Sequence, residues 1–239
     1  MNTLSYNTFS EAITYNRQLE SVVERMSFPK SIWETPFSEV FNQNSSSESF
    51  TLAILKAFDE NENFPKDLLS TFPLEAILSY LRSTHCYYLE KKLPEIEQTF
   101  FNLIADYKKT HPELVRISSL FIDYKQELTH HIQEEENILF PYIDYLIKAK
   151  NNRAYRLKYS NFFKDYYLEK LEESHEDVES SLTNIHQLIH SYAPKTSSVM
   201  PFRVFLLQMD FFEKDLNRHA MMEDLVMMPL AKALESKIK

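Results

Sequence analysis

Two short segments of this sequence repeat one arrangement of a histidine, a glutamate and a proline. They are His131-x3-Glu135-x5-Pro141 and His219-x3-Glu223-x5-Pro229. Residues four apart lie one turn apart on the same face of an α-helix, so each histidine and its glutamate can reach one ion. Imidazole nitrogen and carboxylate oxygen together suit iron, manganese or zinc better than copper(I) or calcium. The repeated pattern therefore indicates a metal site built between helices.

The composition also favours helices. Glycine is absent from all 239 residues, whereas a β-rich fold normally uses glycine in its turns and bulges. Rossmann and P-loop phosphate sites also require glycine, which argues against nucleotide binding by those routes. We therefore expect an all-α fold whose helices end on residues such as asparagine instead of a glycine cap.

Net charge, cysteine count and the lack of targeting segments limit the classes of partner that we expect. The net charge is −9, with acidic and basic residues mixed along the chain, which argues against a nucleic-acid surface. The single cysteine excludes an internal disulfide and a cysteine-only zinc site. No apolar run approaches the roughly 20 residues of a membrane span, and no signal peptide is evident at the N-terminus. We expect a cytoplasmic protein without a membrane partner.

Breaker residues divide the chain into two parts. Residues 1–70 hold short helical patterns and predict a small N-terminal helical domain. Residues 71–239 hold longer amphipathic patterns joined by short connections. The long segments are 73–109, 112–148, 154–192 and 198–236. They predict an antiparallel four-helix bundle.

Each of the last three segments carries an apolar stripe whose members alternate in steps of three and four residues, as bundle-core positions do. In the second segment the stripe is Ile117, Phe121, Tyr124, Leu128, His131, Glu135, Ile138 and Tyr142. In the third it is Leu168, Leu171, His175, Val178, Leu182, Ile185 and Ile189. In the fourth it is Met209, Phe212, Leu216, His219, Glu223, Val226 and Leu230.

Five polar residues interrupt these stripes, and they are His131, Glu135, His175, His219 and Glu223. A lone histidine–glutamate pair at this spacing is most often a surface pair. Burying an unpaired carboxylate in a bundle core costs several kcal/mol or more, however, so five inward groups on three helices need a common partner. A metal ion is the simplest one.

Other polar residues near these positions have ordinary interpretations. His130, Glu134 and Glu136 fall off the stripe, and we expect them to be solvent-exposed. His186 and His190 lie near the end of a predicted helix, where histidines commonly hydrogen-bond the last carbonyl groups.

Several stretches together resemble the hemerythrin-like, HHE cation-binding proteins, and among these the repair-of-iron-centres family of di-iron proteins. The stretches are 84–96, 111–114, 131–141, 173–176 and 219–223. The resemblance runs from about residue 73 to the C-terminus. It implies that Glu135 and Glu223 bridge two non-haem iron ions, with His131, His175 and His219 as further ligands. Many members carry an N-terminal helical domain with a cysteine motif, which this chain lacks.

The resemblance also implies two histidine ligands in the first long segment, where three residues compete. The first position falls on His85 or Cys86, and the second falls on Tyr107. Leu74, Leu78, Leu81, His85 and Tyr88 form one stripe; Cys86, Leu89, Leu93, Ile96, Phe100, Leu103 and Tyr107 form another. We favour His85, because imidazole suits iron and cysteine is commonly core filler. Tyr107 is either a phenolate ligand or a packing residue, so the site holds two ions or only one.

The resemblance implies a protein that repairs or protects iron–sulfur and other iron centres under nitrosative or oxidative stress. Its partners would be dioxygen or nitric oxide and damaged iron–sulfur proteins. One alternative is a hemerythrin-type protein that binds or senses oxygen or nitric oxide without catalysis. A second is a purely structural bundle whose metal site has decayed. Zinc or manganese remains an alternative to iron in any of these.

Overall fold

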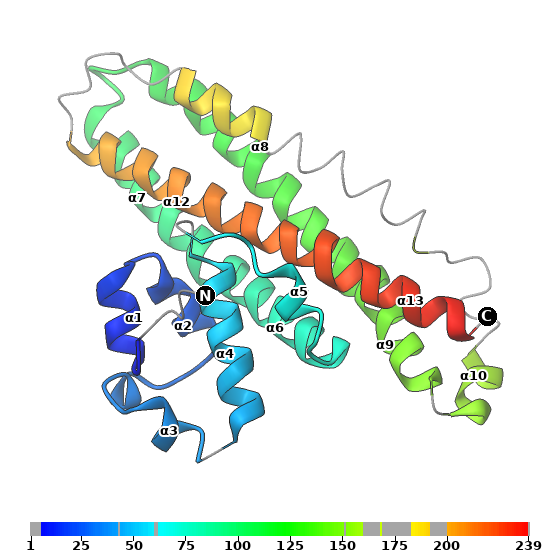
Figure 1. Ribbon diagram of the computed structural model, residues 1–239. Coiled ribbons are helices and arrows are strands. Elements are labelled where there is room, and N and C mark those ends of the chain that lie inside the picture. Colours follow the sequence, from blue (N-terminus) through cyan, green and yellow to red (C-terminus); the bar gives the residue numbers. More distant parts are fainter. Residues whose placement is uncertain are drawn as a thin grey trace. The chain divides into compact units, whose positions relative to one another are not determined.

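The computed structural model describes residues 6–238 apart from 43, 60–61, 151, 160–167, 169–182 and 192–199. Within the described part, every regular element is a helix (Figure 1), which confirms the all-α prediction. No helix among these residues is long and apolar enough to cross a membrane.

Backbone proximity divides the chain into two compact units. The first, here called the N-terminal unit, comprises Met1–Thr84 and Asn217–Leu230. The second, here called the bundle unit, comprises His85–Leu216 and Ala231–Lys239. The predicted domain boundary near residue 70 stays a prediction.

Short helices begin the N-terminal unit. They are α1 (Phe9–Tyr15), α2 (Leu19–Arg25), the 3-10 helix η1 (Lys30–Ile32), α3 (Phe37–Val40), α4 (Ser45–Ala57) and α5 (Lys66–Leu69). Side chains cap two of them: the Thr8 hydroxyl accepts from the Glu11 amide at 3.1 Å, and the Asn44 side chain accepts from the Ser47 amide at 3.2 Å. Each bond satisfies an amide that the first helical turn leaves unpaired.

Because the chain has no glycine, other residues adopt left-handed backbone conformations at two helix ends. Ser27 and Asn42 each follow a helix C-cap directly and have positive φ angles of 60° and 46°. Glycine normally takes this left-handed position, and asparagine tolerates it better than most residues. Asparagine therefore replaces glycine at one helix end, as expected, and serine does so at another.

The longer helices follow. They are α6 (Leu74–Tyr87), η2 (Tyr88–Lys92) and α7 (Leu93–Tyr107); then α8 (Glu113–Glu134), η3 (Glu135–Leu139) and α9 (Phe140–Ala149); α10 (Arg153–Tyr159); a helix at residues 183–191; and α12 (Met200–Met222), η4 (Glu223–Met227) and α13 (Met228–Ile238). The first, second and fourth predicted segments match these runs closely. Much of the third lies outside the described residues.

One hydrophobic cluster joins four helices of the bundle unit. It takes buried residues from α7, α8, the helix at 183–191 and α12 (Figure 1). Three aromatic rings meet within it: the Phe100 centroid lies 4.6 Å from that of Phe205 and 5.4 Å from that of Phe121. Side chains from four chain segments thus share one core, as the bundle prediction requires.

Three π-helices interrupt the long helices in the described part of the chain, and each ends one residue before an apolar–proline pair. The three pairs are Leu93–Pro94, Phe140–Pro141 and Met228–Pro229. In each, the amide before the proline donates to a carbonyl five residues back, namely that of Tyr88, Glu135 or Glu223. Proline has no N–H, and its ring clashes with the carbonyl four residues earlier in an α-helix. The wider π turn before the proline relieves this clash.

A π turn takes up one extra residue, so the buried positions after it fall one residue later than an α-helical stripe predicts. At the end of η3, Leu139 is buried at 4 % exposure while Ile138 is only half-buried. After η4, Ala231 is fully buried while Leu230 is half-buried. The predicted core positions Ile138 and Leu230 were therefore wrong by one residue.

The same shift resolves the two competing stripes of the first long segment. His85 and Tyr88 are buried before the end of η2 and belong to the first stripe. Leu93 and Ile96 are buried after it and belong to the second. The stripes are successive parts of one buried face, joined by the π turn, and Cys86 is exposed.

Adjacent phenylalanines offer a test of the bundle core. Phe100 is 1 % exposed and stacks on Phe205, whereas Phe101 is 50 % exposed. We expect Phe100→Ala to lower the free energy of unfolding by about 3–5 kcal/mol, because it removes a buried ring and leaves a cavity. Phe101→Ala should change it by less than about 0.5 kcal/mol. Denaturant unfolding of both variants measures this, and equal losses would contradict the assigned register.

Candidate metal centre

In the bundle unit, three buried side chains that can ligate a metal meet. Glu135, the first residue of η3, lies between His85 of α6 and His131 of α8. Its Oε2 atom is 3.2 Å from His85 Nε2 and 3.6 Å from His131 Nε2. The three residues are 1–8 % exposed. Two imidazoles and one carboxylate therefore converge away from solvent.

The contacts of His85 Nδ1 indicate which way the lone pair of Nε2 points. His85 Nδ1 lies 2.8 Å from Oε1 of Glu136, and the ring stacks on Phe140 at 5.1 Å with an interplanar angle of 4°. When Nδ1–H donates to that carboxylate, the lone pair of Nε2 points toward Glu135. A lone pair facing a carboxylate oxygen at 3.2 Å suits a proton or a cation held with both. Metal-ligating histidines are commonly oriented by such a second carboxylate.

The N-terminal unit holds a buried histidine–glutamate pair of its own. His219, near the end of α12, places Nε2 3.1 Å from Oε1 of Glu223, the first residue of η4. The two residues are 5 % and 1 % exposed. The helix spacing seen in the sequence thus brings each histidine against its own glutamate, and both pairs are buried as predicted.

The two glutamates share a backbone position that a third residue also occupies. Glu135, Glu223 and Tyr88 each begin a π-helix and precede its proline by six residues. Tyr88 is fully buried, and its hydroxyl donates to Oδ2 of Asp215 at 2.7 Å. The sequence signal for this third member was Pro94, but tyrosine in place of glutamate concealed it.

The remaining predicted ligands lie as follows. Cys86 is exposed. Tyr107 is partly buried against the hydrophobic cluster, and its ring lies 6.3 Å from that of His111. His175 lies outside the described residues.

Two expectations for neighbouring residues had different outcomes. The His130 side chain is 71 % exposed, as expected, and lies 3.6 Å from Glu134. Glu136 was expected in solvent, but its side chain is only 33 % exposed and contacts His85. The stripe missed it because the partner comes from a helix 51 residues away in sequence.

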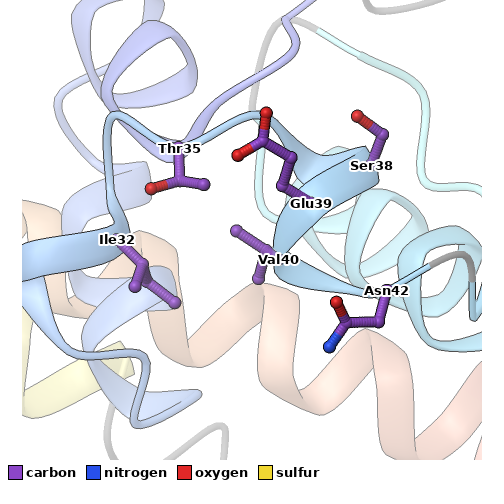
Figure 2. Close-up of a pocket in the computed structure, with 6 residues that line it drawn as sticks. All are labelled: Ile32, Thr35, Ser38, Glu39, Val40 and Asn42. Carbon is purple, nitrogen blue, oxygen red and sulfur yellow. The ribbon is translucent and has the colours of Figure 1, made fainter.

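One pocket of about 730 Å³ opens in the N-terminal unit (Figure 2). Its lining residues are Ile32, Thr35, Ser38, Glu39, Val40 and Asn42. Glu39 is the single ionisable group among them, so this pocket lacks the converging acid, base or ligand groups that a reactive site needs.

Comparison with known families agrees with the donor set. Residues 93–231 match the model of the hemerythrin HHE cation binding domain. The chain belongs to this family. The match includes His131, Glu135, His219 and Glu223 and begins eight residues after His85. No curated protein and no solved structure matches the chain.

The buried histidines and glutamates suit the cation binding after which the hemerythrin HHE domain is named. His85, Glu135, His219 and Glu223 are all buried and all offer ligand atoms. Imidazole and carboxylate ligands suit divalent transition metals. Each unit therefore holds buried side chains that are possible metal ligands.

The Glu136 contact leads to a prediction about metal affinity. We expect Glu136→Gln to weaken metal binding about 10- to 100-fold, because it removes the charged acceptor that orients His85. The matched control is Glu134→Gln, since Glu134 pairs with the exposed His130. Competition with a chromophoric chelator measures both affinities. Equal affinities for the two variants would show that Glu136 does not support a ligand.

Proposed function

We propose that this hemerythrin HHE protein holds a non-haem di-iron centre and uses it to protect or repair iron–sulfur and other iron centres under nitrosative or oxidative stress. The proposed ligands are His85, His131, Glu135, His175, His219 and Glu223. Glu135 and Glu223 would supply carboxylate ligands to the ions, as buried glutamates do in other helix bundles. The observation that carries the proposal is His85, held by Glu136 on one nitrogen and directed at Glu135 with the other.

Electrostatics supports a bound cation. Glu135 and Glu223 are 3 % and 1 % exposed, and removing a carboxylate from water costs several kcal/mol unless opposite charge compensates it. Two divalent ions would compensate both carboxylates, with neutral imidazoles completing the coordination.

The chain's own residues would set what reaches the metal. Bound iron would supply redox chemistry and an open coordination position. Because His85, His131 and His219 are only 1–8 % exposed, the surrounding residues exclude bulk solvent and favour very small ligands. Dioxygen and nitric oxide are of that size. The Phe140 ring stacked on His85 adds an apolar wall to this side.

The same burial favours a second candidate, a hemerythrin-type protein that binds or senses oxygen or nitric oxide without turning it over. It needs the same ligands and the same exclusion of solvent. The two proposals differ in whether the bound gas is consumed.

Iron content tests the centre itself. We expect protein reconstituted anaerobically with ferrous iron to hold about two ions per chain, the stoichiometry of di-iron bundles. Glu223→Gln should lower the content, because it removes a carboxylate ligand. Asp224→Asn is the matched control, since Asp224 is the next residue and is exposed. Well under one iron per wild-type chain would refute the proposal and favour a purely structural bundle.

The same preparation tests whether Tyr107 is a ligand. Because Tyr107 packs against the hydrophobic cluster, we expect Tyr107→Phe to keep the iron content and the visible spectrum of the ferric protein. Loss of a phenolate-to-iron charge-transfer band in this variant would instead make Tyr107 a ligand.

Nitric oxide consumption separates the two functions. Under anaerobic conditions, a repair or detoxifying protein supplied with reductant should consume many equivalents of nitric oxide per chain. A sensor should take up only about as many equivalents as it has open iron positions. An electrode measurement with the Glu223→Gln variant as a blank distinguishes these outcomes.

A further inference from the structure

A second cluster of potential metal ligands lies wholly within the bundle unit. His186 and His190 are one turn apart on the helix at 183–191, and their ring centroids are 4.7 Å apart. Their Nε2 atoms lie 3.3 Å and 2.7 Å from the same oxygen, Oδ1 of Asp210 on α12. Ligand atoms of all three residues fall within 4.8 Å of one another. These histidines were expected to bond helix-end carbonyls, but both face a carboxylate on another helix.

Two of the converging atoms, both histidine Nε2 nitrogens, lack an ordinary hydrogen bond within the described part of the chain. Both Nε2 atoms are buried, and neither makes a hydrogen bond of acceptable geometry to any residue that the structure describes. Burial lowers the pKa of His186, while the nearby carboxylates of Glu213 and Asp210 act in the opposite direction. Neutral imidazole is also the form that ligates metals.

A second carboxylate adds to the negative charge. Glu213 lies one turn after Asp210 on α12. Its Oε1 accepts from the Thr183 hydroxyl at 3.0 Å, and its Oε2 accepts from the Tyr124 hydroxyl at 3.4 Å. Burial, reinforced by Glu213, raises the pKa of Tyr124, so the phenol stays protonated and continues to donate. The two carboxylates, those of Asp210 and Glu213, would balance the charge of one divalent cation.

We propose that His186, His190 and Asp210 form a second metal site, which binds one divalent transition ion such as Zn²⁺. Two imidazoles and one carboxylate form a common three-ligand set for zinc and leave one position open. The His190 and Asp210 side chains are 35 % and 37 % exposed, so the ion would have direct access from solvent. The site is independent of the proposed iron centre and shares no ligand with it.

Bound metal would connect two helices. His186 and His190 belong to one helix and Asp210 to another, so one ion would fasten the helix at 183–191 to α12. An ion that binds the folded state and not the unfolded one stabilises the fold. Zinc would therefore raise the melting temperature of the wild-type chain.

Zinc stoichiometry provides the test, with the full-length chain reconstituted with iron. We expect His190→Ala and Asp210→Asn to bind one Zn²⁺ fewer per chain than wild type in equilibrium dialysis. The matched control is His130→Ala, because His130 also has a carboxylate one turn away but is 71 % exposed. It should bind as many zinc ions as wild type.

Two results would overturn the proposal. One is an unchanged zinc count in both His190→Ala and Asp210→Asn; the other is an equal loss in His130→Ala, which would mean nonspecific surface binding. Iron content of each variant separates this site from the iron centre, because His190→Ala should keep its iron while Glu223→Gln should keep the zinc site. Cobalt(II) spectra of wild type and Asp210→Asn add a second measurement. Loss of a ligand should change the ligand-field bands while the circular dichroism spectrum stays the same, whereas a folding defect would change both.

Discussion

A proline inside a helix cannot donate a backbone hydrogen bond. The chain accommodates this loss with π turns, and these set which later residues are buried. Before Pro94, Pro141 and Pro229, the preceding amide reaches back five residues instead of four. Two of the accepting carbonyls belong to Glu135 and Glu223. The backbone at each buried glutamate is thus tied into a π turn, a feature that is often found at functional sites.

The buried charges impose the second constraint. A helical core tolerates a carboxylate only where opposite charge or hydrogen bonds compensate the lost water. In the bundle unit, His85 and His131 lie against Glu135, and Glu136 holds the far side of the His85 ring. Outer carboxylates commonly orient metal-binding histidines in the same way. The hemerythrin HHE family assignment agrees with that reading.

Local periodicity predicted the helices, the inward histidine–glutamate pairs and the bundle core. It failed where a contact or a hydrogen bond depends on something other than spacing along one regular helix. Leu139 replaced Ile138 in the core because a π turn changed the phase. Glu136 lay off the stripe of its own helix, yet it meets a histidine 51 residues earlier.

The first long segment shows the limit most clearly. Two stripes compete there when each is extended along an uninterrupted α-helix, and the π turn before Leu93 joins them. His186 and His190 were misinterpreted for a related reason. Their partner Asp210 lies on another helix, and the sequence of one helix says nothing about which neighbour faces it.

The π turns also affect how this chain should be compared with others. Each acts as a one-residue insertion, so the two halves of a long helix keep separate phases. An ungapped alignment or a design template that treats 113–149 as one continuous helix would match Ile138 with core positions that Leu139 occupies. Deleting one residue between a glutamate and its proline would remove this insertion, so the later buried side chains would fall on the stripe of a regular α-helix. Deleting one residue from a regular α-helical part would instead rotate every later side chain by about 100° and turn the buried face toward water.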